Sequence, residues 1–186
     1  TAYTETLYFK SEDGLRITAD LYHIKKSAPI IVLCHQAGWS RGEYKEIGPK
    51  LNALGFNCLA IDQRSGGAVK GVDNETAKRA AEEGKSTDYI DAKQDIIAAI
   101  GKAKDLYGKK VVLWGSSYSS ALALIVATET EDVERVLSFS PGEYLGTVNV
   151  NERIATLNKP AFFTSAKNEQ GQTKLLYDAI ESDEKT

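Results

Sequence analysis

The sequence predicts an α/β fold with a doubly wound, mostly parallel sheet, and two patterns lead to this prediction. Short, nearly continuous apolar runs recur after residue 28, and such runs are typical of strands buried on both faces of a parallel sheet. Segments with helical spacing of apolar residues separate the runs, which favours a three-layer sandwich of helices around the sheet. The five predicted strands are residues 29–35, 56–62, 110–116, 133–140 and 159–166.

The first 24 residues follow a different pattern. Residues 3–11 and 15–24 alternate apolar and polar side chains, as a strand with one buried face does. The pair Asp13-Gly14 between them is a hairpin signal. We therefore expect two antiparallel N-terminal strands at the edge of the sheet.

Helical spacing indicates where the helices lie. We expect a helix over residues 87–108 to open at Ser86 or Thr87 as its N-cap and to end at Gly108. Further helices are expected over residues 41–55, 118–130, 151–158 and 171–182.

A long loop, residues 63–86, follows the carboxyl end of a predicted strand, where the chemistry of such sheets is located. It is expected to border the site, with a short helix inside it, or else to be a solvated insertion without a role. Asp62, Arg64 and Gly66 follow the same strand end, and we expect them to stabilise this border without taking part in catalysis.

Length and composition narrow the class of protein. A chain of 186 residues fits one domain, residues 1–186, and a net charge of −3 without a basic stripe argues against nucleic acid as a partner. No apolar run reaches the roughly 20 residues that cross a bilayer, so a soluble protein is expected.

Cys34 and Cys58 lie inside apolar runs and are expected to be buried. No zinc motif or nucleotide-binding motif is present, and no metal or organic cofactor is implied.

Serines crowd one junction between a predicted strand and a predicted helix, in the run Gly115-Ser116-Ser117-Tyr118-Ser119. A serine on a tight strand-to-helix turn has a strained backbone, and the residues two before and two after it must be small because strand and helix crowd there. Only Ser117 meets this requirement, with Gly115 before it and Ser119 in the place where glycine is usual. We expect Ser117 to be a nucleophile.

An acyl-transfer site also needs backbone N–H groups that face the developing oxyanion. The Tyr118 N–H, at the predicted helix N-terminus, is the first candidate. The second comes from the turn Gln36-Ala37, where Ala37 is the natural donor by position. Tyr118 and Trp39 are the aromatic residues nearest the site, and each could line an acyl pocket or serve in packing.

Residues 35–67, 113–124 and 158–169 together resemble the α/β-hydrolase fold, and within it the dienelactone-hydrolase-like group. The resemblance implies the order nucleophile, acid, histidine along the chain. In the family the acid follows a strand that begins after Lys-Pro, and Glu169 stands at this place. A carboxylate there orients the histidine and stabilises its charged form. Glu143, after the preceding strand, is the alternative acid.

The family's histidine lies after one more strand, and residues 1–186 contain neither. His23 lies on the early edge strand, and His35 ends the strand before the oxyanion turn. His35 is expected to be a structural histidine, with a role as base as a minor alternative. We expect the natural chain to continue past Thr186 to the strand and the histidine; otherwise the chain is a non-catalytic relative.

These patterns predict a serine hydrolase that cleaves a small ester or related acyl compound through an acyl-serine intermediate. A small-molecule substrate is therefore the expected partner. The alternative is a catalytically inactive protein of the same fold that binds a ligand in the same pocket or has a regulatory role.

Overall fold

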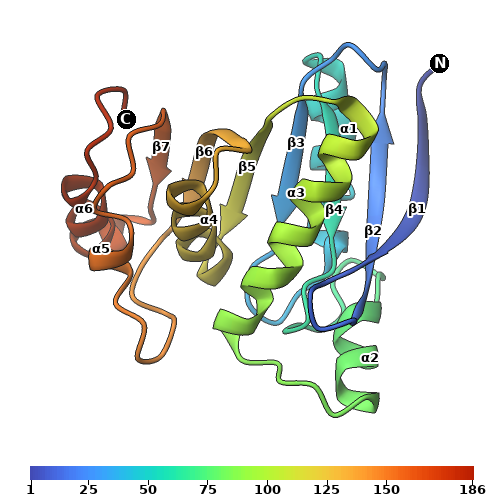
Figure 1. Ribbon diagram of the computed structural model, residues 1–186, viewed down its shortest axis with the longest axis horizontal. Coiled ribbons are helices and arrows are strands. Elements are labelled where there is room, and N and C mark those ends of the chain that lie inside the picture. The colour runs from blue at the N-terminus through green and yellow to red at the C-terminus, as the bar shows by residue number, and fades with distance from the viewer.

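The computed structural model describes residues 1–186 and shows seven strands in one sheet, in the order β1-β2-β4-β3-β5-β6-β7 (Figure 1). β3 to β7 run parallel to one another, and β1 and β2 run antiparallel to their neighbours. This arrangement confirms the predicted fold class. The strands are β1 (Tyr3–Lys10), β2 (Arg16–His23), β3 (Ile30–Cys34), β4 (Asn57–Ile61), β5 (Val111–Ser116), β6 (Val133–Phe139) and β7 (Ala161–Thr164).

The N-terminal hairpin forms as predicted. β1 and β2 pair over their whole lengths, from Tyr3 opposite His23 to Lys10 opposite Arg16. Gly14 has a φ of +84°, which a glycine adopts without strain in the connecting turn. β2 then pairs with β4, so the hairpin extends the edge of the sheet.

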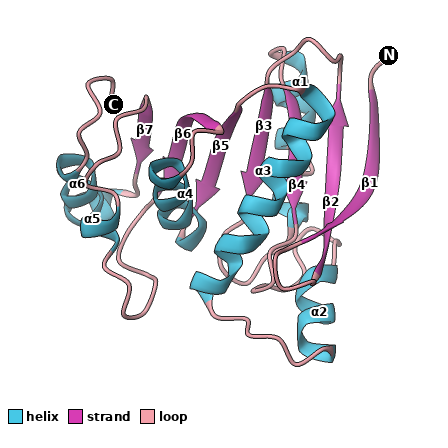
Figure 2. Cartoon of the chain, viewed as in Figure 1, coloured by secondary structure: helices cyan, strands magenta, loops and turns pink.

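Helices flank the sheet at most of the predicted places (Figure 2). The α-helices are α1 (Ile47–Ala53), α2 (Glu75–Glu82), α3 (Lys93–Tyr107), α4 (Tyr118–Glu129), α5 (Val150–Arg153) and α6 (Gln170–Ala179). The 3₁₀ turns are η1 (Arg41–Tyr44), η2 (Tyr89–Ala92) and η3 (Lys167–Glu169).

Two predicted helices begin later than expected. The 41–55 helix splits into η1 and α1, because Pro49 has no N–H and fits only the first turn of a helix. The 87–108 helix becomes η2 followed by α3, and neither Ser86 nor Thr87 caps it. The Ser86 hydroxyl donates to the Asp91 carboxylate. The predicted end of the 87–108 helix is confirmed, since Gly108 is left-handed with a φ of +66°.

The two sides of the central strands pack against different helices. Ile30, Val32 and Cys34 belong to the core under α3 to α6, whereas Ile31 and Leu33 pack on the opposite side, with α1. Figure 1 shows α3 to α6 in front of the sheet and α1 behind it. Cys34 and Cys58 are fully buried, as expected, and are not joined in a disulfide. No helix is both long and apolar enough to cross a membrane.

Buried ion pairs fix the start of the long 63–86 loop. Arg64 is 1% exposed and its guanidinium contacts Asp95 at 2.8 Å and Asp13 at 2.7 Å. Arg41 contacts Asp62 at 2.6 Å. A side chain on Gly66 would collide with the Trp39 carbonyl oxygen, since its Cβ would lie 2.1 Å away. The start of the loop is therefore tightly packed against the strand ends.

Candidate active site

Ser117 lies at the turn between β5 and α4, at the carboxyl edge of the sheet. Its backbone has φ +59° and ψ −126°, a conformation that non-glycine residues rarely adopt. Its N–H donates to the Phe139 carbonyl of β6 at 2.9 Å, which fixes the turn to the neighbouring strand. The side chain is half-buried, so the hydroxyl is neither sealed in the core nor fully solvated.

The crowding expected around Ser117 is present. A Cβ on Gly115 would lie 2.3 Å from the Ser119 carbonyl oxygen and 2.8 Å from the Ser120 nitrogen. The Ser119 hydroxyl is buried, donates to the His35 carbonyl at 2.5 Å and accepts from Gln63 at 2.6 Å. Small residues are therefore required on both sides of Ser117.

Gly115→Ala is expected to destabilise the fold by about 1–3 kcal/mol, because the added methyl meets backbone atoms that cannot move aside. Gly101→Ala is the matched control, since Gly101 lies in α3 with open space at its Cβ. That control should be neutral or slightly stabilising. Urea unfolding of both variants measures the difference, and equal stabilities would contradict the packing argument.

Tyr118 is the first residue of α4, and its N–H has no acceptor within the helix. Its side chain is 1% exposed and stacks on Tyr89 with ring centroids 4.3 Å apart. Its hydroxyl accepts from Gln63 at 2.8 Å and donates to the Ser65 carbonyl at 3.2 Å. Of the two predicted roles, lining an acyl pocket or packing, the Tyr118 ring therefore has the packing role. Tyr89 is the aromatic residue of this pair that faces outward.

The turn after β3 lies next to this junction, because β3 and β5 are neighbours and Cys34 pairs with Gly115. The Gln36 N–H donates to the Glu43 carboxylate at 2.8 Å, so it is already occupied. Of the two candidates in this turn, Ala37 is the one left as an oxyanion donor. Trp39 is half-buried, and its carbonyl accepts from the Gly67 N–H at 3.1 Å.

Glu169 follows β7, two strands from Ser117 at the same edge of the sheet. The register places the ends of β5, β6 and β7 side by side, with Ser116, Phe139 and Thr164 in one row. Glu169 Oε2 accepts from the Tyr144 hydroxyl at 3.2 Å and from Gln172 Nε2 at 3.3 Å. These contacts hold one oxygen of the carboxylate and leave Oε1 for another donor.

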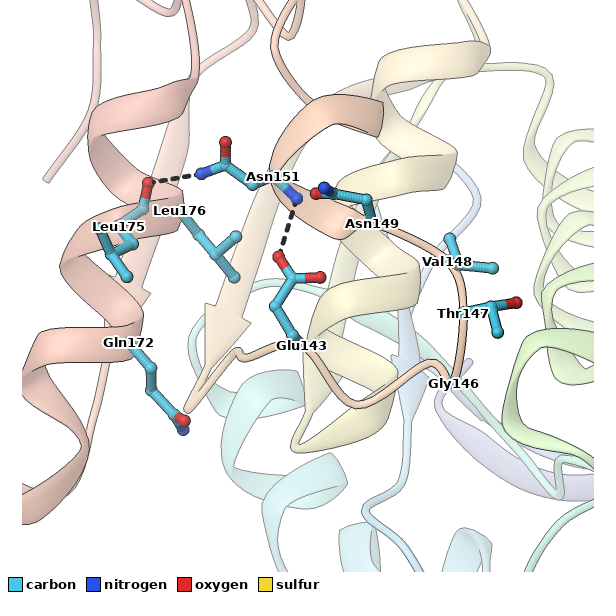
Figure 3. A pocket seen from close by; sticks show the side chains of 9 residues that line it. All are labelled: Glu143, Gly146, Thr147, Val148, Asn149, Asn151, Gln172, Leu175 and Leu176. Atoms are coloured by element: carbon cyan, nitrogen blue, oxygen red, sulfur yellow. Dashed lines mark hydrogen bonds between the residues drawn. The ribbon is translucent and has the colours of Figure 1, made fainter.

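Glu143 has a structural partner instead. Its two carboxylate oxygens accept from the backbone N–H groups of Val150 (2.7 Å) and Asn151 (3.0 Å), at the start of α5. Figure 3 shows this carboxylate turned toward α5. A carboxylate that satisfies the first N–H groups of a helix has little capacity left to orient a histidine. The geometry favours Glu169 over Glu143.

Two open clefts flank the loop between β6 and α5. One, of about 500 Å³, lies between this loop and α6 and includes Glu143, Asn151 and Leu175 (Figure 3). The other, of about 420 Å³, separates the loop from the start of η2. The second cleft includes Tyr89, which stacks on Tyr118, and Tyr144, which contacts Glu169. Ser117 and Glu169 do not line this cleft themselves, and it is linked to their positions through Tyr118 and Tyr144.

Neither histidine is placed to activate Ser117. His23 lies on β2 and stacks between Tyr3 and Tyr107. Its neighbour Tyr22 pairs with the amino end of β4, so His23 lies at the edge of the sheet opposite to Ser117. His35 is fully buried, and backbone groups occupy both ring nitrogens. Nδ1 donates to the Gln36 carbonyl and Nε2 accepts from the Gln63 N–H, each at 2.9 Å. This geometry gives His35 the structural role.

Burial lowers the pKa of His35 to about 4, because the charged ring would lose its hydration. Its neutral form should therefore contribute about 2–3 kcal/mol of stability at pH 7 that is lost as the pH falls from about 6.5 to 4.5. Urea unfolding of the parent and His35→Gln at both pH values measures this difference. Subtracting the pH dependence of the variant's stability removes the opposing effect of Glu43, Asp62 and Asp95, whose pKa values burial raises. Equal pH dependence of stability in the two proteins would contradict this prediction.

Several residues around the site are absent from the sequence-based prediction. They are Glu43, Tyr89, Tyr144 and Gln172, and of these Tyr89 and Tyr144 lie far along the chain from the residues they contact. Only Glu43 had a local signal, since it falls within the stretch that resembles the hydrolase family.

Comparisons with known proteins find a matching family model and a curated relative. The model of the family described as "Serine aminopeptidase, S33" (Hydrolase_4) matches residues 25–185. The thiohydrolase apmlB of Arthrinium phaeospermum is 29% identical over 139 residues, which are 74% of this chain but 43% of that protein. The chain therefore spans less than half the length of this curated relative.

Solved structures show the same fold at low sequence identity. The dienelactone hydrolase of Anabaena variabilis superposes with a TM-score of 0.78 at 15% identity, over 99% of this chain and 84% of that one. An esterase of Pyrococcus furiosus superposes with a TM-score of 0.71 at 17% identity, over 99% and 82% of the two chains.

Proposed function

Because the chain belongs to the serine aminopeptidase (Hydrolase_4) family of α/β hydrolases, we propose that it is a serine hydrolase with Ser117 as its nucleophile. One observation carries the proposal. Ser117 has a φ of +59° at a tight turn between a buried strand and the N-terminus of a helix. Such strain persists only where the surrounding structure imposes it, and it places the hydroxyl at a positive helix end.

In the proposed reaction Ser117 Oγ attacks the carbonyl carbon of the substrate while a histidine accepts its proton. The N–H groups of Tyr118 and Ala37 stabilise the oxyanion. The leaving group departs with the proton from the imidazolium, and water then releases the acyl group from Ser117. Glu169 orients the histidine through its free carboxylate oxygen.

The proposed histidine lies outside residues 1–186, since His23 and His35 are both held elsewhere.

The proposed substrate is a small ester or thioester with an apolar acyl group. The cleft beside Tyr89 and Tyr144 is more than half apolar in its lining residues, and its single charged residue is Asp88. A neutral acyl group suits this lining better than an anionic one. The relatives and neighbours include a thiohydrolase and esterases, which supports acyl transfer to water as the reaction class.

Stopped-flow hydrolysis of p-nitrophenyl butyrate by the full-length protein tests this proposal. An acyl-serine mechanism should release a burst of about one equivalent of p-nitrophenol before steady turnover. The matching thioester, followed through its released thiol, tests the second substrate class. Saturable binding of the ester without turnover would contradict the proposal and favour the alternative, a ligand-binding or regulatory protein of this fold.

A further inference from the structure

One carboxyl group beside the proposed site has no part in the reaction described above. Glu43 lies in η1, and its carboxyl accepts the N–H of Gln36 at 2.8 Å. Ser116 lies close enough to this carboxyl to help hold its pKa down. Gln36 precedes Ala37, Ser116 precedes Ser117, and the strands before these two turns are neighbours. Glu43 therefore binds the turn that carries one proposed oxyanion donor and lies beside the turn that carries the nucleophile.

The backbone around Glu43 is held on both sides. The Arg41 N–H donates to the buried Asp62 carboxylate at 2.8 Å. The Tyr44 hydroxyl donates to the Cys34 carbonyl at 2.6 Å, and Tyr44 is fully buried. These contacts join η1 to the ends of β4 and β3, so the Glu43 carboxyl starts from a fixed position.

Burial of the Glu43 carboxyl raises its pKa, and the hydrogen bond from the Gln36 N–H, the nearby Tyr44 and Ser116 hydroxyls and the charge of Lys70 oppose that rise. Burial of a carboxyl group costs free energy unless its hydrogen bonds are satisfied. An apolar side chain of similar size would avoid this cost at a position that only needed to be filled. The hydrogen bond to the Gln36-Ala37 turn, beside the Ser116-Ser117 turn, points to a role for the group.

We infer that Glu43 is a positioning residue that fixes the Gln36-Ala37 turn against the Ser116-Ser117 turn, so that the Ala37 N–H faces the oxyanion. This inference rests on the proposed function. By accepting the Gln36 N–H, Glu43 fixes the peptide plane between His35 and Gln36, and the next plane, which carries the Ala37 N–H, is built on it through the Gln36 Cα. A displacement of an oxyanion donor by even an ångström is costly to the transition state.

The test compares Glu43→Ala and Glu43→Gln in the full-length protein, with Glu46→Ala as the control. Glu46 is exposed, lies three residues away and also approaches Lys70, at 3.7 Å. The measurements are kcat and KM for p-nitrophenyl butyrate and the rate of Ser117 phosphonylation by an uncharged fluorophosphonate. A urea unfolding curve for each variant shows that it is folded under the assay conditions.

Glu43→Ala should lower kcat and the phosphonylation rate by about tenfold to a hundredfold while KM changes little, because the lost contact acts on the transition state. Glu43→Gln should recover most of the rate, since its amide oxygen still accepts the Gln36 N–H. Glu46→Ala should match the parent. A folded Glu43→Ala at the parent rate, or a Glu43→Gln as slow as Glu43→Ala, would overturn the inference. A parent whose Ser117 does not react at all would instead overturn the proposed function, and the inference with it.

Discussion

Ser117→Ala should lower kcat/KM for ester hydrolysis by about 10⁴–10⁶-fold, the loss typical of removing a nucleophile from a serine hydrolase. Alanine removes only the hydroxyl oxygen. The backbone of the turn is held by the hydrogen bond from the residue 117 N–H to Phe139 and by the packing around Gly115. The variant should therefore stay folded and still bind substrate, with its effect confined to kcat. Steady-state kinetics with p-nitrophenyl butyrate measure it.

Ser140→Ala is the matched control for this prediction. Ser140 follows β6 as Ser117 follows β5, and it has the same φ of +59°. It is not part of the proposed reaction, so its variant should stay within about twofold of the parent. Retention of activity within tenfold by Ser117→Ala, or an equal loss in both variants, would contradict the assignment of Ser117 as the nucleophile.

Asp95→Ala should lower the free energy of unfolding by about 3–5 kcal/mol, the usual effect of removing one partner of a buried ion pair. The Asp95 carboxylate is fully buried and accepts three hydrogen-bond donors of Arg64: the backbone N–H, Nε and Nη2. Without it the buried guanidinium keeps only Asp13 and Ser11 as partners. The start of the 63–86 loop should loosen as well, because Arg64 anchors it.

The exposed pair Lys174–Asp178 on α6 gives the control for the buried pair. Both side chains are more than half exposed, and Asp178→Ala should change stability by no more than about 0.5 kcal/mol. Chemical denaturation at neutral pH, with circular dichroism as the probe, measures both variants. Equal effects at the two positions would show that burial of the Arg64–Asp95 pair does not set its strength.

The sheet could be predicted because its strands carry a local signal. Runs such as 29–35 and 110–116 are almost continuously apolar, since both faces of these strands are covered by helices. Helix starts were less predictable, because competing side-chain contacts decide them. The Ser86 hydroxyl accepts the N–H of Asp88, which precedes η2, and not an N–H inside the helix, and α3 begins only at Lys93.

The candidate site was predictable only where geometry constrains the residue type locally. The small residues around Ser117 follow from crowding between β5 and α4, and this requirement is visible in five consecutive residues. Tyr144, which contacts Glu169, and Gln63, which supplies the second hydrogen bond of His35, lie 25 and 28 residues away from them along the chain. Such contacts leave no periodic pattern in a sequence. The contact between Glu43 and the Gln36 N–H spans seven residues across a turn and leaves no such pattern either.

The most direct test of the account is the mass of the full-length protein after reaction with a fluorophosphonate, followed by peptide mapping of the adduct. The account predicts one adduct per chain, located on Ser117 and absent from Ser117→Ala. A folded protein that gives no adduct, or an adduct on any other residue, would contradict the claim that Ser117 is an activated nucleophile.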